Sequence, residues 1–233
     1  MASTLQVDGA ITGSSTINGV GINVIETGSI LVSNDGGTGT ISSALRNTGL
    51  GFEVFDDLTS GDDNTGVGRK ALTKLTTGGG NTATGSGSLT AHTTGDSNTA
   101  FGVSALASNT TASNNTAVGS SALLANTTGT LNTAVGKDAG LAVTTGDSNT
   151  LIGALAGDAL TEGTDNVVVG KSSLSADTLG SRSVALGKNT LAAQNFTSAT
   201  NVYNTAVGHD AGKAVSTGIQ NTLIGGLAGD AIT

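Results

Sequence analysis

The chain has 233 residues, including 37 glycines but no proline, cysteine or tryptophan, and its formal net charge is −8. Without cysteine it can form neither a disulfide framework nor a thiolate metal site. Its nine lysines and arginines are scattered and form no basic stripe, which argues against nucleic-acid binding. The sequence has neither an apolar run long enough for a spanning helix nor a signal-like start. We therefore expect no membrane insertion, and synthesis in a cytoplasm without export.

Residues 1–63 form the first region. The stretch from Leu5 to Asn34 alternates apolar and polar residues, which indicates short strands and turns in an irregular, β-rich segment. For residues 41–58 we expect a helical turn followed by a small plug that carries Phe52 and Phe55. At minimum, this region caps the first open edge of whatever follows it.

Residues 64–233 consist of ten repeats of a unit that begins with a phrase such as NTAVG. The interval is seventeen residues throughout, except for one that is four residues longer. The fifth position is always glycine and the ninth is always leucine or glycine, while a matching pair of units, which begins at Asn132 and again at Asn204, recurs after four units. The units begin at Asn64, Asn81, Asn98, Asn115, Asn132, Asn149, Asn166, Ser183, Asn204 and Asn221. A fixed period of this kind is the signature of a solenoid.

Each unit is too short for a helical repeat, and its Thr, Val and Ile residues favour short strands separated by glycine-rich turns. We therefore predict an all-β fold in which each unit is one coil of a parallel β-solenoid. The second and fourth side chains of a strand share one face, and the third points to the other. We expect the fourth-position Val, Ile or Leu to fill the coil. The third-position alanine would then pack against another chain, which predicts a homo-oligomer and most simply a homotrimer.

The phrase N-[TS]-[AV]-[VIL]-G-x-x-A-[LG] resembles the head repeats of trimeric adhesins, and its seventeen-residue form is similar to repeats of bacteriophage tail fibres. The resemblance covers residues 64–233. It implies a left-handed parallel β-roll of three chains in a virion fibre that is assembled in the host cytoplasm. It also implies an N-terminal region that attaches to a virion tail or capsid protein, and repeats that reach a host surface receptor such as a glycan.

Two other classes of protein fit the repeats less well. A bacterial surface adhesin would need an export signal and an anchor. An ice-binding solenoid would need a regular outward row of threonines, but the second-position threonine is replaced at Val167 and Val184 and shares its parity with the expected core residue.

Residues that could support catalysis or bind a metal or cofactor are scarce. The triplet Gly170–Ser172 lacks the glycine that a phosphate-binding loop needs five residues earlier, and Gly-Asp pairs such as Gly95-Asp96 occur without the calcium-roll nonapeptide. We expect His92 and His209 to be exposed substitutions. The sequence predicts no enzyme, no cofactor and no metal site.

The four extra residues lie between Asn195 and Tyr203. Insertions in solenoids are placed in loops on one face, which is often the binding face. Asn195, Phe196 and Tyr203 are therefore candidates for a lateral contact with a receptor; alternatively, the segment is a bulge whose aromatic side chains pack on the roll. The last unit stops thirteen residues into its period, so we also expect a longer fibre that continues beyond Thr233.

Overall fold

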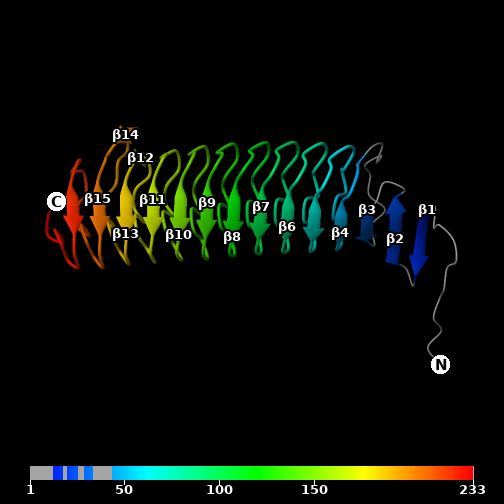
Figure 1. Cartoon of the computed structure of the whole chain (residues 1–233), viewed down its shortest axis with the longest axis horizontal. Coiled ribbons are helices and arrows are strands. Elements are labelled where there is room, and N and C mark those ends of the chain that lie inside the picture. Colours follow the sequence, from blue (N-terminus) through cyan, green and yellow to red (C-terminus); the bar gives the residue numbers. More distant parts are fainter. Residues whose placement is uncertain (1–12, 18–19, 26–28, 34–43, 233) are drawn as a thin grey trace, which may run out of the picture.

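The repeats form a rod built from one long sheet and the turns that close its coils. The computed structural model describes residues 13–17, 20–25, 29–33 and 44–232, with side chains from residue 44 onward. These residues contain strands and turns but no helix. The strands succeed one another along the long axis (Figure 1), and fourteen of them share one sheet. The prediction of an all-β solenoid is confirmed.

The sheet is antiparallel at its beginning and parallel from there on. β1 (Gly13–Ile17) pairs antiparallel with β2 (Val20–Ile25), β2 pairs antiparallel with β3 (Ser29–Ser33), and β3 pairs parallel with β4. Eleven mutually parallel strands follow: β4 (Thr48–Leu50), β5 (Thr65–Val67), β6 (Thr82–Thr84), β7 (Thr99–Phe101), β8 (Thr116–Val118), β9 (Thr133–Val135), β10 (Thr150–Ile152), β11 (Val167–Val169), β13 (Val184–Leu186), β15 (Thr205–Val207) and β16 (Thr222–Ile224). A second sheet pairs β12 (Gly180–Ser181) with β14 (Thr200–Asn201) in parallel.

The regular coils begin at Asn47, one unit before Asn64. Thr48 pairs with Thr65, seventeen residues on, and the later coils pair at the same interval except at β13 and β15, where Val184 pairs with Thr205. The helical turn expected in residues 41–58 is wrong for the described part, residues 44–58, because the N-T-G-L-G phrase at Asn47 starts a strand. Phe55 does not form a separate plug, because it is buried in the row that leucine occupies in later coils, whereas Phe52 is partly exposed.

A buried row of asparagines at the first position joins each coil to the next. The Asn132 side-chain amide donates to the Gly146 carbonyl of its own coil (2.7 Å), which ties the start of the coil to its end. The Asn132 Oδ1 accepts hydrogen bonds from the backbone N–H (2.9 Å) and side-chain amide (3.1 Å) of Asn149 in the next coil. Buried polar groups are tolerated only when they are paired in this way. The row therefore closes each coil and sets its register.

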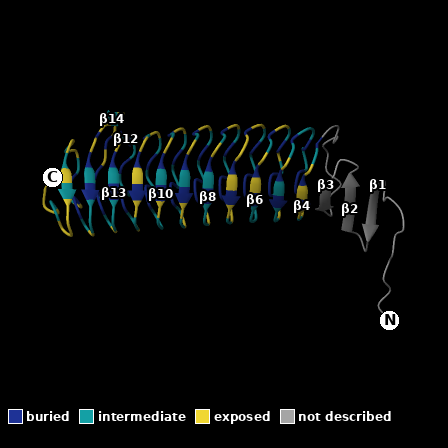
Figure 2. Ribbon diagram, in the orientation of Figure 1, coloured by how far each residue is buried: buried dark blue, intermediate teal, exposed yellow. Residues whose placement is uncertain are grey.

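The structure reverses the expected inside and outside of the strands. The third-position side chain is the buried one, as with Ala117 and Ala134 at 0% exposure, while the fourth-position Val118 and Val135 lie on the outer surface. Figure 2 shows this alternation along the rod. The coil is narrow, and its interior is already occupied by side chains from the eighth, ninth and twelfth positions, such as Ala122 and Leu123. Only a small residue fits opposite them in most coils, which is why alanine recurs at the third position.

The side-chain sizes at the third and ninth positions compensate for each other. Leu151 replaces alanine at the third position, and glycine then replaces leucine at the ninth position of its own coil and of the preceding coil. A Cβ on Gly157 would lie 2.8 Å from the Leu151 Cδ2, and one on Gly140 would lie 2.7 Å from its Cδ1. The choice between leucine and glycine at the ninth position is therefore a packing rule, since protein cores are filled close to crystal density.

The packing rule predicts a rescue. Leu151→Ala should lower the free energy of unfolding by about 2–4 kcal/mol, because it leaves a cavity beside two glycines. Adding Gly157→Leu should recover at least half of that loss, because the coil then has alanine at its third position and leucine at its ninth, as the coil of Ala117 and Leu123 does. Leucine tolerates the positive φ of this position, as Leu123 (φ 50°) shows. Urea unfolding of the two single variants and the double variant checks the prediction, and losses that simply add would contradict it.

His92 is buried, and the prediction that it is exposed is wrong. It occupies the twelfth position, a core row, with 0% exposure. Its Nε2 lies 2.8 Å from the Gly95 carbonyl oxygen and its Nδ1 lies 3.1 Å from the Asn109 Oδ1. Burial lowers the pKa of His92 below its ordinary value, against the opposing effects of these hydrogen bonds and of Asp96. His209 is exposed, as predicted, with 60% of its side chain accessible.

The lowered pKa of His92 predicts a pH-dependent stability. As the pH falls below about 6.5 the unfolded chain binds a proton at this site before the folded chain does, so the free energy of unfolding decreases until the folded-state pKa is passed. His92→Asn places the residue of the next coil, Asn109, at the same position without a titrating group. The wild type should therefore lose more stability than this variant between pH 7.5 and 5.5 in thermal melts. Parallel pH profiles for the two proteins would contradict the prediction.

Candidate functional site: the sheet face and the bulge

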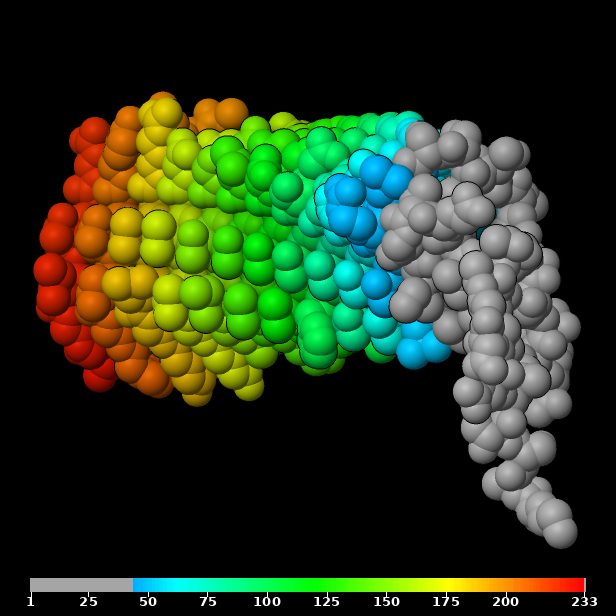
Figure 3. Space-filling model, turned by 45° about the vertical axis from the view of Figure 1, so that its right-hand side comes forward, coloured from blue at the N-terminus to red at the C-terminus, as the bar shows by residue number. Residues whose placement is uncertain are grey.

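The first candidate surface is the outward side of the parallel sheet, which we call the sheet face and define as the second- and fourth-position side chains of the eleven mutually parallel strands. The fourth position forms an in-register row that is apolar except at Thr84. Its exposed members are Leu50, Phe101, Val135, Ile152, Val169 and Ile224. Figure 3 shows how equivalent residues of successive coils line up in rows along the rod. Among the described residues, no segment of the chain covers this row.

The second position of the sheet face forms a row of threonines. Seven follow one another without interruption, from Thr48 to Thr150. Within the described chain these hydroxyls have no hydrogen-bonding partner. A different row of threonines, in the turns, behaves otherwise: Thr76 Oγ1 donates to the Thr93 carbonyl of the next coil (3.0 Å), and Thr93 repeats the contact with Thr110 (3.0 Å). The sheet face therefore presents free hydroxyls beside methyl groups, at the spacing of the strands.

The second candidate surface is the segment that contains the four extra residues, which we call the bulge and define as residues 195–203. It is anchored from below by Asp177, whose carboxylate is fully buried. The Asp177 Oδ1 accepts hydrogen bonds from the backbone N–H groups of Gly180 (3.0 Å) and Phe196 (3.0 Å), and its Oδ2 accepts one from the Gln194 amide (2.6 Å). Three donors satisfy a buried carboxylate well. The base of the bulge is therefore tightly held.

The coil beneath the bulge also departs from the asparagine row. Ser183 stands where the other units have asparagine, and Gln194 supplies the missing amide. The Gln194 Nε2 donates to the Ser183 Oγ (3.1 Å), and its Oε1 accepts from the Asn204 amide (2.8 Å). The substitution at Ser183 and the insertion in the bulge are thus parts of one local rearrangement.

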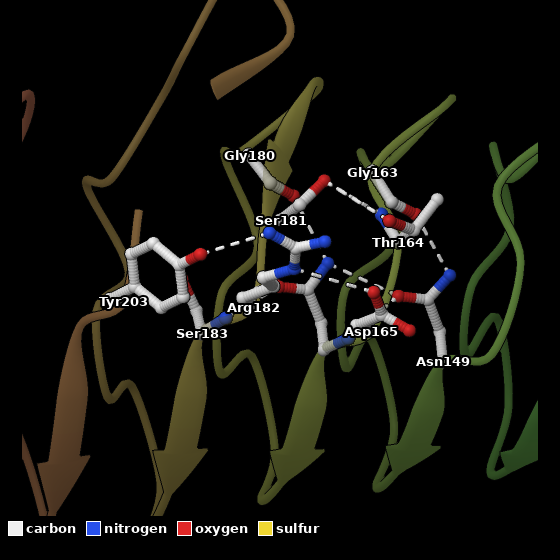
Figure 4. Close-up of polar contacts among 10 residues, drawn as sticks. Asn149, Gly163, Thr164, Asp165, Gly180, Ser181, Arg182, Ser183 and Tyr203 are labelled. Carbon is white, nitrogen blue, oxygen red and sulfur yellow. Dashed lines mark hydrogen bonds and ion pairs between the residues drawn. The ribbon is translucent and has the colours of Figure 1, made fainter. Parts of the chain in front are cut away.

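At the rim of the bulge an aromatic ring lies beside a charged pair (Figure 4). The Arg182 Nη1 donates to the Tyr203 hydroxyl (2.9 Å), and the Arg182 Nε lies 3.5 Å from the Asp165 Oδ2. The Tyr203 hydroxyl and the Asp165 carboxylate both hold the pKa of Arg182 above its ordinary value. All three residues occupy the last position of their coils and have positive φ angles of 54–64°. They are therefore neighbours on three successive coils.

The three residues named from the sequence occupy two different environments. Phe196 is buried at 9% exposure, whereas Asn195 is exposed and Tyr203 is 49% exposed. Phe196 thus packs on the roll, as the bulge interpretation expects, and Tyr203 does not. Sequence reasoning missed Arg182 and Asp165, although a signal was available: they are seventeen residues apart, which places them on adjacent coils at the same position.

Other kinds of site are not apparent in the part of the chain that the structure describes. It contains no helix that could cross a bilayer, and no group of three or more His, Asp or Glu side chains that could hold a metal ion. No protein-family model, curated protein or solved structure matches the chain. Its function must therefore be argued from the two surfaces alone.

Proposed function

We propose that the chain is a structural fibre protein of a virion, in particular of a bacteriophage, that forms a homotrimeric rod. The rod projects from the particle and spaces or mediates attachment to the host cell. The observation that carries this proposal is the sheet face, whose fourth-position row is apolar except at Thr84 and is not covered by any part of the described chain. Large exposed apolar strips on soluble proteins mark interaction surfaces.

The occupant of the sheet face that fits best is another copy of the chain. Eleven strands spaced about 4.8 Å apart make a strip roughly 50 Å long. A straight, regular strip of this kind is complementary to an identical strip in the same register. Three strips that meet on a common axis would bury the fourth-position side chains and place the threonine row beside a neighbouring chain. Three is the number that the resemblance to adhesin heads and phage fibres implies.

In this proposal the remaining parts of the chain serve attachment. Residues 1–63 would dock on a virion tail or capsid protein, assembly would take place in the host cytoplasm, and the solenoid would carry the contact with a host surface receptor. A bacterial surface adhesin with the same roll would use the same interface. Labelling of purified virions with an antibody against the chain, viewed by electron microscopy, distinguishes the fibre from the adhesin.

If the chain self-associates through the sheet face, one charged residue introduced there should disrupt the trimer. The wild type should sediment at three times the mass of the chain, and Ile152→Asp should yield a smaller species at micromolar concentration, because it places a carboxylate in an apolar interface. Thr111→Asp, at an exposed turn position outside the sheet face, serves as the matched control and should leave the trimer intact. Sedimentation equilibrium measures both, and circular dichroism checks the fold.

Ile152→Thr provides a second test, because threonine suits a strand and removes apolar contact without adding charge. It should weaken the trimer less than the aspartate does. A wild-type chain that is a stable, folded monomer would overturn the proposed trimer. So would an Ile152→Asp variant that stays trimeric.

One observation favours a second candidate function, ice binding. The sequence alone places the second-position threonines on the core side of the strand, whereas in the structure they lie on its outer side. Seven threonines with free hydroxyls stand in a straight outward row. An ice-binding face would have to remain exposed, so the chain would be monomeric and would show thermal hysteresis that Thr116→Leu reduces. Under the fibre proposal we expect no hysteresis, and nanolitre osmometry measures it directly.

A further inference from the structure

The Tyr203 ring at the rim of the bulge has the properties of a binding platform. It is 49% exposed and, with Phe52 and Phe101, is one of three exposed aromatic side chains among the described residues. The Arg182 Nη1 donates to the phenol oxygen, and the Arg182 Cζ lies 5.7 Å from the ring centroid, so the guanidinium can cover at most one face of the ring (Figure 4). A ring held at its polar end offers an apolar face of fixed orientation.

The polar groups beside the ring are also held in place. The Arg182 backbone N–H donates to the Thr164 carbonyl (3.0 Å), and the Val202 N–H donates to the Ser181 carbonyl (3.0 Å). The backbone at Arg182 and the backbone next to Tyr203 are therefore each bonded to the preceding coil. β12 and β14 pair directly beside the site. Because these groups lose little freedom on binding, a ligand would meet a preorganised surface.

The site combines three chemical features within three coils: an apolar aromatic face, a guanidinium that can only donate hydrogen bonds, and a carboxylate that accepts them. The Asp165 carboxylate and the Arg182 side chain are both about half exposed. A pyranose sugar matches all three features, since one side of its ring presents C–H groups and its hydroxyls both donate and accept.

We propose that Tyr203, Arg182 and Asp165 bind a neutral hexose unit of a host surface polysaccharide. The sugar ring stacks on Tyr203, one hydroxyl accepts from the Arg182 guanidinium, and another donates to the Asp165 carboxylate. An acidic sugar is disfavoured, because Asp165 and the net charge of −8 repel it. This inference deepens the proposed attachment role and rests on it for its biological meaning.

The bulge extends the surface for further sugar units. Asn195, Thr197, Ser198 and Asn201 are exposed on it, while Phe196 and the buried Asp177 fix its base. Tyrosine, serine and asparagine side chains are the groups that protein recognition loops use for adaptable polar contacts. An oligosaccharide should therefore bind more tightly than a single hexose.

Tyrosine fluorescence tests the proposal at the site itself, because Tyr203 is the sole tyrosine and the chain has no tryptophan. The full chain is titrated with neutral pentasaccharides of glucose, galactose and mannose, and with pentagalacturonate as the acidic counterpart. We expect a saturable change in emission with at least one neutral probe and a weaker response to pentagalacturonate. Arg182→Gln should weaken the binding of that neutral probe about tenfold, the usual loss for one hydrogen bond to a charged group.

Lys137→Gln is the matched control, because it removes a surface cation that also lies beside an aspartate, Asp138, but in a coil three coils before the one that carries the bulge. It should leave the affinity unchanged. No saturable change with any neutral probe up to millimolar concentration would overturn the proposal, as would tighter binding of pentagalacturonate or equal losses in the two variants. Sedimentation equilibrium on the same samples tests the trimer separately, so failure of the sugar site and failure of the fibre proposal can be told apart.

Discussion

The asparagine row is the interaction on which the rest of the structure depends. Each first-position amide bonds to the end of its own coil and to the start of the next, as Asn98 does with Ala112 (2.8 Å) and with the Asn115 N–H (3.0 Å). A coil of this size contains little apolar surface, and its strands are only three residues long. Side-chain amides therefore perform the task of closing the coil that longer strands or a larger core would perform elsewhere. Loss of one amide would leave unpaired polar groups inside the rod, at about 1–3 kcal/mol each.

Backbone conformation makes the narrow coil possible. Fifth-position glycines such as Gly119 have φ near 138°, and a Cβ there would lie 2.4 Å from the Gly136 carbonyl oxygen of the next coil. Only glycine allows the backbones of successive coils to approach so closely. Other corners place larger residues at positive φ, including buried leucines such as Leu123. These conformations are unfavourable for a single residue, and they persist because packing and hydrogen bonds on every side hold them.

One candidate surface repeats along the rod and the other occurs once, and the proposed partners differ in the same respect. The sheet face repeats with the period of the coils, so it suits a partner with the same period, such as another copy of the chain. The bulge occurs once. Beneath it Ser183 replaces the asparagine of the other units, and Gln194 bonds to both Ser183 and Asn204. A site that occurs once on a regular rod suits a small ligand, since nothing else on the described surface offers the same combination of Tyr203, Arg182 and Asp165.

Much of the fold could be predicted from local pattern. The seventeen-residue period, the short strands and the alternation of faces follow from spacing, glycine and β-branched residues, and the insertion at residues 195–203 is visible as a break in that spacing. Within the candidate site, the same break in the spacing identifies Tyr203 as a candidate for a lateral contact. Asp165 and Arg182 follow once position in the coil is considered together with residue type.

The sequence by itself determined that Thr116 and Val118 lie on one side of their strand and Ala117 on the other. Only the tertiary structure decided which side is interior, because that depends on Ala122, Leu123 and Asn126, which reach the same strand after the coil has turned back. The same reason places His92 inside and turns Phe196 inward while Tyr203 faces outward. Alternation is a property of the local backbone, whereas burial is a property of the space that distant residues leave free.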